Sequence, residues 1–146
     1  MIDEEAQDKV LFTIKINKKH WSMLKDYSKK NKPLETCAIL FGKRKYNQFT
    51  VTEIITMDND DKSEIKFAIN EEKLYLTYRK AESVNLSVVG IYHTHPSKPI
   101  PSKTDMKFME INPVPWVIHS TITDEAKCYI HNESKGILEI ELIIMD

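Results

Sequence analysis

The chain has 146 residues, the length of one domain that can bury a core of its own. Its 21 basic and 22 acidic side chains nearly balance, and 41% of its residues are hydrophobic. These figures exclude a disordered polyelectrolyte and give no support for nucleic acid as a partner. The longest apolar stretches fall far short of the roughly 18 residues that a membrane helix needs, so we expect no membrane span.

The N-terminal sequence and the cysteines indicate the compartment. Residues 3–5 are acidic where a secretory signal is basic, and no apolar segment follows them, so we expect a cytoplasmic protein. Cys37 and Cys128 are too few for a disulfide framework and lie in apolar runs. Buried free thiols are the expected state, and one bridge between the two stays open.

The chain shows no internal repeat or linker, so residues 1–146 are expected to form a single domain. Apolar and polar residues alternate over residues 10–16, which predicts a half-buried strand. Asn17 is placed to cap a helix over about residues 18–30. That helix is expected to bury three residues at helical spacing: Trp21, Leu24 and Tyr27.

Two neighbouring strands are predicted next. Residues 37–41 form a short apolar run that Gly42 is expected to end, and residues 49–55 alternate in polarity. The basic triplet at 43–45 is therefore expected at a solvated hairpin tip. The acidic cluster at 58–61 lacks the spacing of a calcium loop and is expected to be a polar loop.

The second half of the chain predicts more strands than helices. Asn70 precedes two glutamates, which favours a helix start, and apolar residues follow at helical spacing as far as Ala81. Residues 86–92 are almost continuously apolar, the pattern of a central strand. A proline-rich loop and a short helix precede three strand candidates at 114–118, 126–130 and 137–144. The prediction is an α/β (α+β) fold with a mixed central sheet or open barrel flanked by helices.

Chemistry concentrates in the segment that follows the central strand, which begins with His-Thr-His-Pro at residues 93–96. Residues i and i+2 of extended backbone point to the same side, so His93 and His95 can direct both imidazoles at one point. Prolines stiffen the loop that follows, and Ser102 then starts a helix as its cap. Asp105 is expected one turn into that helix, on a rigid support.

Two histidines and one carboxylate would leave a tetrahedral zinc ion with one open position for water, as in catalytic zinc sites. Each half of the pattern is weak alone, because His-X-His pairs occur by chance and Ser-X-X-Asp is often only a capping box. Here both halves occur within residues 93–105, and Glu35 begins an earlier apolar strand. Such a carboxylate is the base that a zinc hydrolase needs.

The remaining histidines have structural interpretations. His20 lies at a helix start and is expected at the surface or at its boundary. His119 and His131 lie at strand ends without partnered ligand spacing. Each is expected to be a hydrogen-bonded structural side chain.

These motifs resemble those of the JAMM/MPN+ metallopeptidase family: an upstream Glu, then His-X-His-Pro, a short loop and Ser-X-X-Asp. Residues 33–42 also resemble the family's strand with its Glu, Cys, apolar pair and terminal Gly. The resemblance implies a cytidine-deaminase-like fold in which His93, His95 and Asp105 bind Zn²⁺. Glu35 would then hold and deprotonate the water, and Ser102 would stabilise the oxyanion of the tetrahedral intermediate.

The resemblance also implies a substrate class. It indicates a zinc isopeptidase or peptidase of minimal prokaryotic type that hydrolyses the bond after the C-terminal tail of a ubiquitin-like or sulfur-carrier-like modifier. The modifier and its conjugates are the expected partners. A chain this short lacks long insertions, so we expect modest linkage preference, and a monomer or weak homodimer.

Two departures from the family pattern concern positioning rather than ligands. Residues 96–101 make a loop of six between His95 and Ser102 where the family usually has seven, and Ala38 replaces a glycine. Two other functions stay open, a non-catalytic MPN scaffold and a RadC-like protein. The intact ligands argue against the scaffold, whereas Thr94 in place of Asn and the balanced charge argue against the RadC-like protein.

Overall fold

The computed structural model describes residues 12–57 and 70–146. Part of the strand predicted over residues 10–16 and all of the loop predicted at 58–61 lie outside this range. The elements, in chain order, are β1 (Thr13–Asn17), α2 (Lys18–Lys30), β2 (Cys37–Lys45), β3 (Gln48–Met57), α3 (Glu71–Ser83), β4 (Ser87–His95), α4 (Lys103–Ile111), β5 (Trp116–Ser120), β6 (Ala126–Asn132) and β7 (Gly136–Met145). Within this range no helix combines the length and the apolar character that crossing a bilayer requires.

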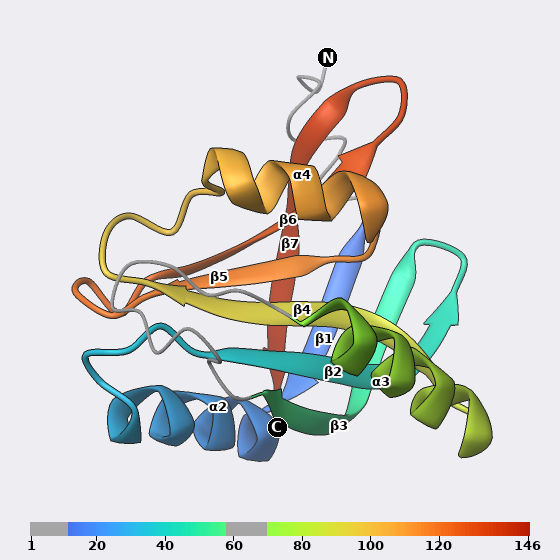
Figure 1. Ribbon diagram of the computed structural model, residues 1–146, viewed down its shortest axis with the longest axis horizontal. Coiled ribbons are helices and arrows are strands. Elements are labelled where there is room, and N and C mark those ends of the chain that lie inside the picture. The colour runs from blue at the N-terminus through green and yellow to red at the C-terminus, as the bar shows by residue number, and fades with distance from the viewer. Residues whose placement is uncertain (1–11, 58–69) are drawn as a thin grey trace.

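The strands form a barrel in the order β1-β3-β2-β4-β5-β6-β7 (Figure 1). β1 pairs in parallel with both β3 and β7, and β4 pairs in parallel with β5, whereas the other neighbours are antiparallel. The predicted mixed α+β architecture with flanking helices is confirmed. The barrel is closed rather than open, because β1 joins the two strands that would otherwise be its edges.

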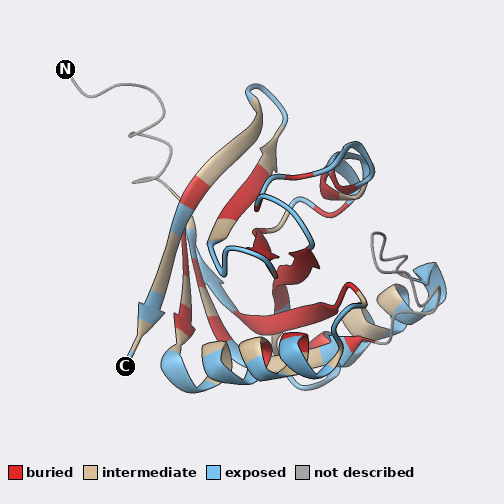
Figure 2. Ribbon diagram, turned by 90° about the vertical axis from the view of Figure 1, so that its left-hand side faces the viewer, coloured by how far each residue is buried: buried red, intermediate tan, exposed pale blue. Residues whose placement is uncertain are grey.

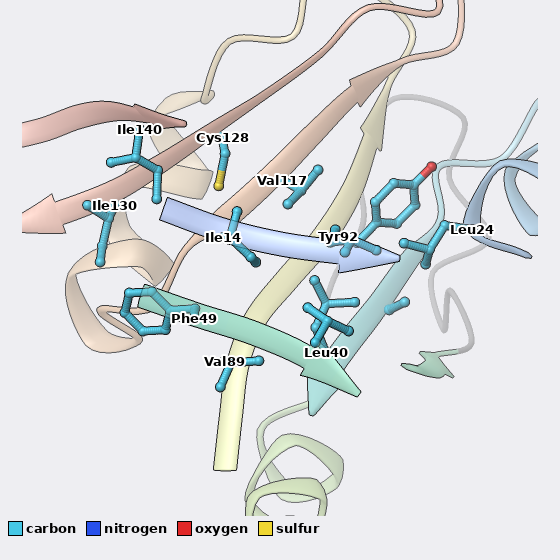
Figure 3. Packing of buried hydrophobic residues seen from close by; sticks show 13 residues of the cluster. Ile14, Leu24, Leu40, Phe49, Val89, Tyr92, Val117, Cys128, Ile130 and Ile140 are labelled. Atoms are coloured by element: carbon cyan, nitrogen blue, oxygen red, sulfur yellow. The ribbon is translucent and has the colours of Figure 1, made fainter. Parts of the chain in front are cut away.

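Apolar side chains from every strand fill the barrel interior, as the close view in Figure 3 shows. They alternate with outward-facing residues along most strands, as the pleat requires, but in β4 the interior residues Val89 and Tyr92 are three positions apart, where the pairing with β2 shifts register. Helix α2 contributes Leu24, which is fully buried, while Trp21 packs against the cluster only in part. The strand residues of this cluster are Ile14, Ile16, Ala38, Leu40, Phe49, Val51, Val89, Tyr92, Val117, Cys128, Ile130 and Ile140.

A second apolar cluster lies on the outer face of β2, β4, β5 and β6, where α3 and α4 cover it with Ala81 and Met109. Burial is concentrated on the strands, and the helices expose their outer sides (Figure 2). Cys37 belongs to this outer cluster and Cys128 to the interior one. Both are free thiols, so the bridge left open by the sequence does not form.

The predicted helix starts are confirmed by their caps. The Asn17 side chain accepts a hydrogen bond from the His20 N–H at 2.7 Å, and the Asn70 side chain accepts one from the Lys73 N–H at 3.0 Å. Ser102 caps α4 in the same way. Each side chain satisfies a backbone donor that the first helical turn leaves without a partner.

The expected end of β2 at Gly42 is wrong, because the strand continues to Lys45 and the turn lies at Tyr46 and Asn47. Gly42 marks an irregularity in the pairing with β3. A Cβ there would lie 1.8 Å from the carbonyl oxygen of Thr50. The glycine therefore permits a close approach of two strands and does not terminate one.

Candidate metal centre

β4 delivers both motif histidines to the outer face of the barrel. It runs to His95, so the backbone is extended through the whole His-Thr-His segment. His93 is 5% exposed and His95 7%, and their ring centroids lie 4.7 Å apart. The intervening Thr94 is fully buried. The predicted alternation of side chains is confirmed.

The loop after β4 returns the chain so that α4 presents Asp105 to the histidines. The Tyr129 hydroxyl donates to the Pro99 carbonyl at 2.9 Å and so fixes this loop. Asp105 Oδ2 lies 2.9 Å from His95 Nε2, and Asp105 Oδ1 lies 3.6 Å from His93 Nε2. The three side chains predicted as metal ligands therefore come together.

Glu35 joins this group from the segment just before β2. It is 4% exposed, and its Oε2 lies 3.6 Å from His93 Nε2. Potential ligand atoms of Glu35, His93 and His95 all lie within 4.8 Å of one another. The second carboxylate predicted from the sequence thus lies beside the histidines.

The two histidines differ in their electrostatic surroundings. Burial lowers the pKa of His93 to about 4, so its ring is neutral at pH 7. Burial is the largest single influence on His95 and would lower its pKa, but the hydrogen bond to Asp105, the negative charges of Asp105 and Glu35, and a backbone hydrogen bond together raise this pKa. Burial is likewise the largest single influence on Asp105 and favours its neutral form, yet the same hydrogen bond, the nearby histidines and the Ser102 N–H together lower its pKa. Without a metal, this pair favours imidazolium beside carboxylate.

The pKa of Glu35 is shifted in the opposite direction to that of Asp105. Burial raises the pKa of Glu35 to about 7, although the nearby charge of His95 opposes this change. The carboxyl group can therefore both accept and release a proton near neutral pH. General bases and acids are most effective in this range.

The donor set fits a zinc ion. Two imidazoles and one carboxylate are the ligands of many catalytic zinc sites, and here all three are buried and converge. Each imidazole ring is also hydrogen-bonded to backbone, His93 to Thr36 and His95 to Ile100. Such bonds fix the ring orientation of metal-binding histidines.

Ser102 lies in an exposed position at the start of α4. Its Oγ accepts a hydrogen bond from the Asp105 N–H at 3.0 Å, and Asp105 Oδ2 accepts one from the Ser102 N–H at 2.8 Å. Because Oγ is the acceptor in the first bond, that bond does not use the hydroxyl proton. The capping function is confirmed, and donation to an oxyanion stays a prediction.

His119 takes no part in this group. Its Nδ1 lies 2.7 Å from the Tyr92 hydroxyl and its Nε2 lies 2.7 Å from Asp124 Oδ1. The prediction of a hydrogen-bonded structural histidine is confirmed for this residue. His20 is half-buried, at the predicted boundary of the surface, and His131 is half-buried too.

Comparisons with known proteins agree with this geometry. The family model described as prokaryotic homologs of the JAB domain matches residues 17–131, a range that includes Glu35, His93, His95 and Asp105. A desampylase from Pyrococcus furiosus is 33% identical over 112 residues, which are 76% of each chain.

Two solved structures show the same fold. One is the solution structure of a protein from Desulfitobacterium hafniense, with a TM-score of 0.78 and 21% identity over 91% of this chain and 93% of that one. The other is the solution structure of a protein from Salinibacter ruber, with a TM-score of 0.66 and 20% identity over 90% of this chain and 91% of that one. By its sequence match and its fold, the chain belongs to the prokaryotic JAB-domain family.

Proposed function

We propose that the protein is a zinc-dependent isopeptidase or peptidase that hydrolyses the bond after the C-terminal tail of a ubiquitin-like modifier. The observation that carries this proposal is the buried convergence of His93, His95 and Asp105, with Glu35 3.6 Å from His93. The similarity to a desampylase, a hydrolase of ubiquitin-like modifier conjugates, supports the substrate class.

His93, His95 and Asp105 would hold the zinc ion. Zinc bound there would polarise the scissile carbonyl and lower the pKa of a water molecule. His93 is already neutral at pH 7 and needs no deprotonation to bind a cation. His95 must give up the proton that its pairing with Asp105 favours.

Glu35 would carry the proton. Its carboxylate takes a proton from the attacking water and passes it to the leaving nitrogen, so the amine departs uncharged. A pKa of about 7 suits both steps, because neither proton transfer then runs far uphill at neutral pH. The Ser102 hydroxyl would donate to the oxygen that becomes negative as the carbonyl is attacked.

The test uses a ubiquitin-like β-grasp protein that ends in Gly-Gly, joined to a reporter through a peptide bond and, separately, through a lysine side chain. The zinc-loaded protein should cleave after the second glycine. Treatment with EDTA should abolish cleavage, and zinc should restore it. A fusion with two valines in place of the glycines is the matched control. If the zinc-loaded protein cleaves neither fusion, the proposal is wrong.

A further inference from the structure

The position of Glu35 depends on the residue that joins it to the sheet. Glu35 lies two residues before β2, which begins at Cys37. Cys37 pairs with His93 of β4 in an antiparallel register. Continuing that register by one residue sets Thr36 opposite Thr94, beyond the last pair of the β2–β4 ladder.

This additional pair has an unusual hydrogen-bond pattern. The Thr94 N–H donates to the Thr36 carbonyl at 3.0 Å, as in a regular ladder. The Thr36 N–H donates at 2.8 Å to the hydroxyl oxygen of Thr94 instead of to its carbonyl. A regular antiparallel pair of this kind exchanges two main-chain bonds. Here a side-chain hydroxyl replaces one of the main-chain acceptors.

Burial makes this hydroxyl hard to replace. Thr94 is 0% exposed and Thr36 2%, and their two hydroxyl oxygens lie 3.1 Å apart. Water does not reach a donor at such depth, so the Thr36 N–H needs a protein acceptor. The ring of His93 is hydrogen-bonded to the Thr36 backbone as well. Thr36 thus connects Glu35 and His93 to the same side chain.

Thr94 itself points away from the site. Its neighbours His93 and His95 lie on the outer face, and alternation along β4 directs Thr94 toward the barrel interior. Its hydroxyl is therefore linked to Glu35 through Thr36. We propose that Thr94 is a positioning residue, whose hydroxyl accepts the Thr36 N–H and so sets the Glu35 carboxylate against the two histidines. The effect on turnover rests on the proposed function, whereas the effect on geometry does not.

The experiment compares two variants of Thr94. Thr94→Val keeps the shape and loses the hydroxyl, whereas Thr94→Ser keeps the hydroxyl. The matched control is Thr13→Val, because the buried hydroxyl of Thr13 has no hydrogen-bond partner among the described residues. Zinc content, kcat and KM on the Gly-Gly fusion, and amide hydrogen exchange are measured for each protein. Crystal structures give the distance from Glu35 Oε2 to His93 Nε2.

Thr94→Val should lower kcat by about 10- to 100-fold, the loss typical of a catalytic group displaced by about 1 Å, with KM and zinc content unchanged. The Thr36 amide should exchange faster, and Glu35 should move from its place 3.6 Å from His93. Thr94→Ser should match the parent within about twofold in kcat, as should Thr13→Val. A merely structural role would lower stability in Thr94→Val without lowering kcat separately from KM or moving Glu35.

The inference is overturned if Thr94→Val keeps the parent's Thr36 exchange and Glu35 position, or if serine and valine behave alike. If Thr94→Val fails to fold, Thr94→Ala takes its place under the same criteria. If the parent cleaves no fusion, the proposed function fails alone, because Thr36 exchange and the Glu35 position still decide the geometric inference.

Discussion

Three side chains of the candidate site, those of Glu35, Ser102 and Asp105, have both a structural role and a proposed chemical role. Asp105 accepts the Ser102 N–H in the capping box with the same Oδ2 that contacts His95. Ser102 accepts the Asp105 N–H while its hydroxyl proton stays available. Glu35 is buried like a core residue, and that burial raises its pKa to about 7. Variants at these positions must therefore be tested for both roles.

Glu35→Gln separates metal binding from proton transfer. The amide is nearly the same size as the carboxylic acid and cannot accept the proton, so turnover should fall by about 10²- to 10⁴-fold. Zinc content should stay at one ion per chain, because the three proposed ligands are unchanged. Elemental analysis and steady-state kinetics measure the two effects. Cleavage at the parent's rate would show that Glu35 is not the base.

Ser102 requires two substitutions. Ser102→Ala removes the cap, which costs about 1 kcal/mol of stability, and also removes the hydroxyl donor, which should lower kcat by about 10²- to 10³-fold. Ser102→Asp keeps a good cap but brings negative charge toward the developing oxyanion. Asp105 keeps the Ser102 N–H in both variants, so zinc content should not change. If Ser102→Asp retains full activity while Ala loses only stability, the hydroxyl acts as a cap alone.

The pairing register of β2 and β4 sets which residues of the two strands lie beside one another at the site. β2 and β4 lie side by side in the barrel, so the backbone before β2 faces the end of β4 (Figure 1). The end of β4 is held from its other side by the β5–β6 connection, where the Thr121 N–H donates to the His95 carbonyl at 2.9 Å. Pro115 adds no N–H to a ladder, and β5 begins only at Trp116, two residues later than the strand predicted over residues 114–118.

Gly42→Ala tests how closely β2 and β3 must approach. The new Cβ would overlap the Thr50 carbonyl oxygen, and this neighbour is backbone that cannot rotate away. We expect a loss of about 1–3 kcal/mol, near the upper end of that range, or about 6–10 °C in melting temperature. Lys43→Ala, at the exposed neighbouring position, is the control and should change stability little. A parent-like melting temperature for Gly42→Ala would mean that the strands can separate at small cost.

At the scale of the whole molecule, metal binding should be linked to pH through the charges of the site. In the metal-free protein the pKa of His95 is raised mainly by Asp105 and that of Glu35 by burial, so each group keeps its proton to a higher pH than it would in water. A cation favours neutral His95 and charged Glu35, so zinc binding should release both protons. His93 contributes no proton, because its pKa is lowered to about 4.

Zinc affinity should therefore fall as the pH falls through the raised pKa values of His95 and Glu35. Near pH 7 zinc binding should release protons from both groups, and Glu35→Gln should reduce the number released. Calorimetry in buffers of different ionisation enthalpy counts these protons. An affinity that is independent of pH between about 5.5 and 8 would contradict this assignment of protonation states.

Local signals in the sequence predict most of the elements and the side chains of the candidate site. Periodicity, caps and the prolines located the helices and most strands, because these patterns act over one or two turns of chain. The His-X-His spacing likewise predicts that His93 and His95 share one face of β4, and the Ser-X-X-Asp spacing places Asp105 in the first turn of α4. The short loop between these two elements keeps the two halves of the motif close. For Glu35 the local signal is weaker, because it consists only of a carboxylate at the start of an apolar strand.

Other features depend on contacts between residues far apart in the chain, so only the tertiary structure decided them. The barrel closes because β1 pairs with both β3 and β7. The alternation of residues 13–17 predicts a strand but does not indicate which strands pair with it. In the sequence, Gly42 is typical of a residue that ends a strand. In the structure, a glycine is needed there because the Thr50 backbone lies too close for a Cβ. The bond from the Thr36 N–H to Thr94 spans 58 positions and arises from strand register. Sequence patterns reflect local propensity, whereas register and close approach are set when distant segments pack together.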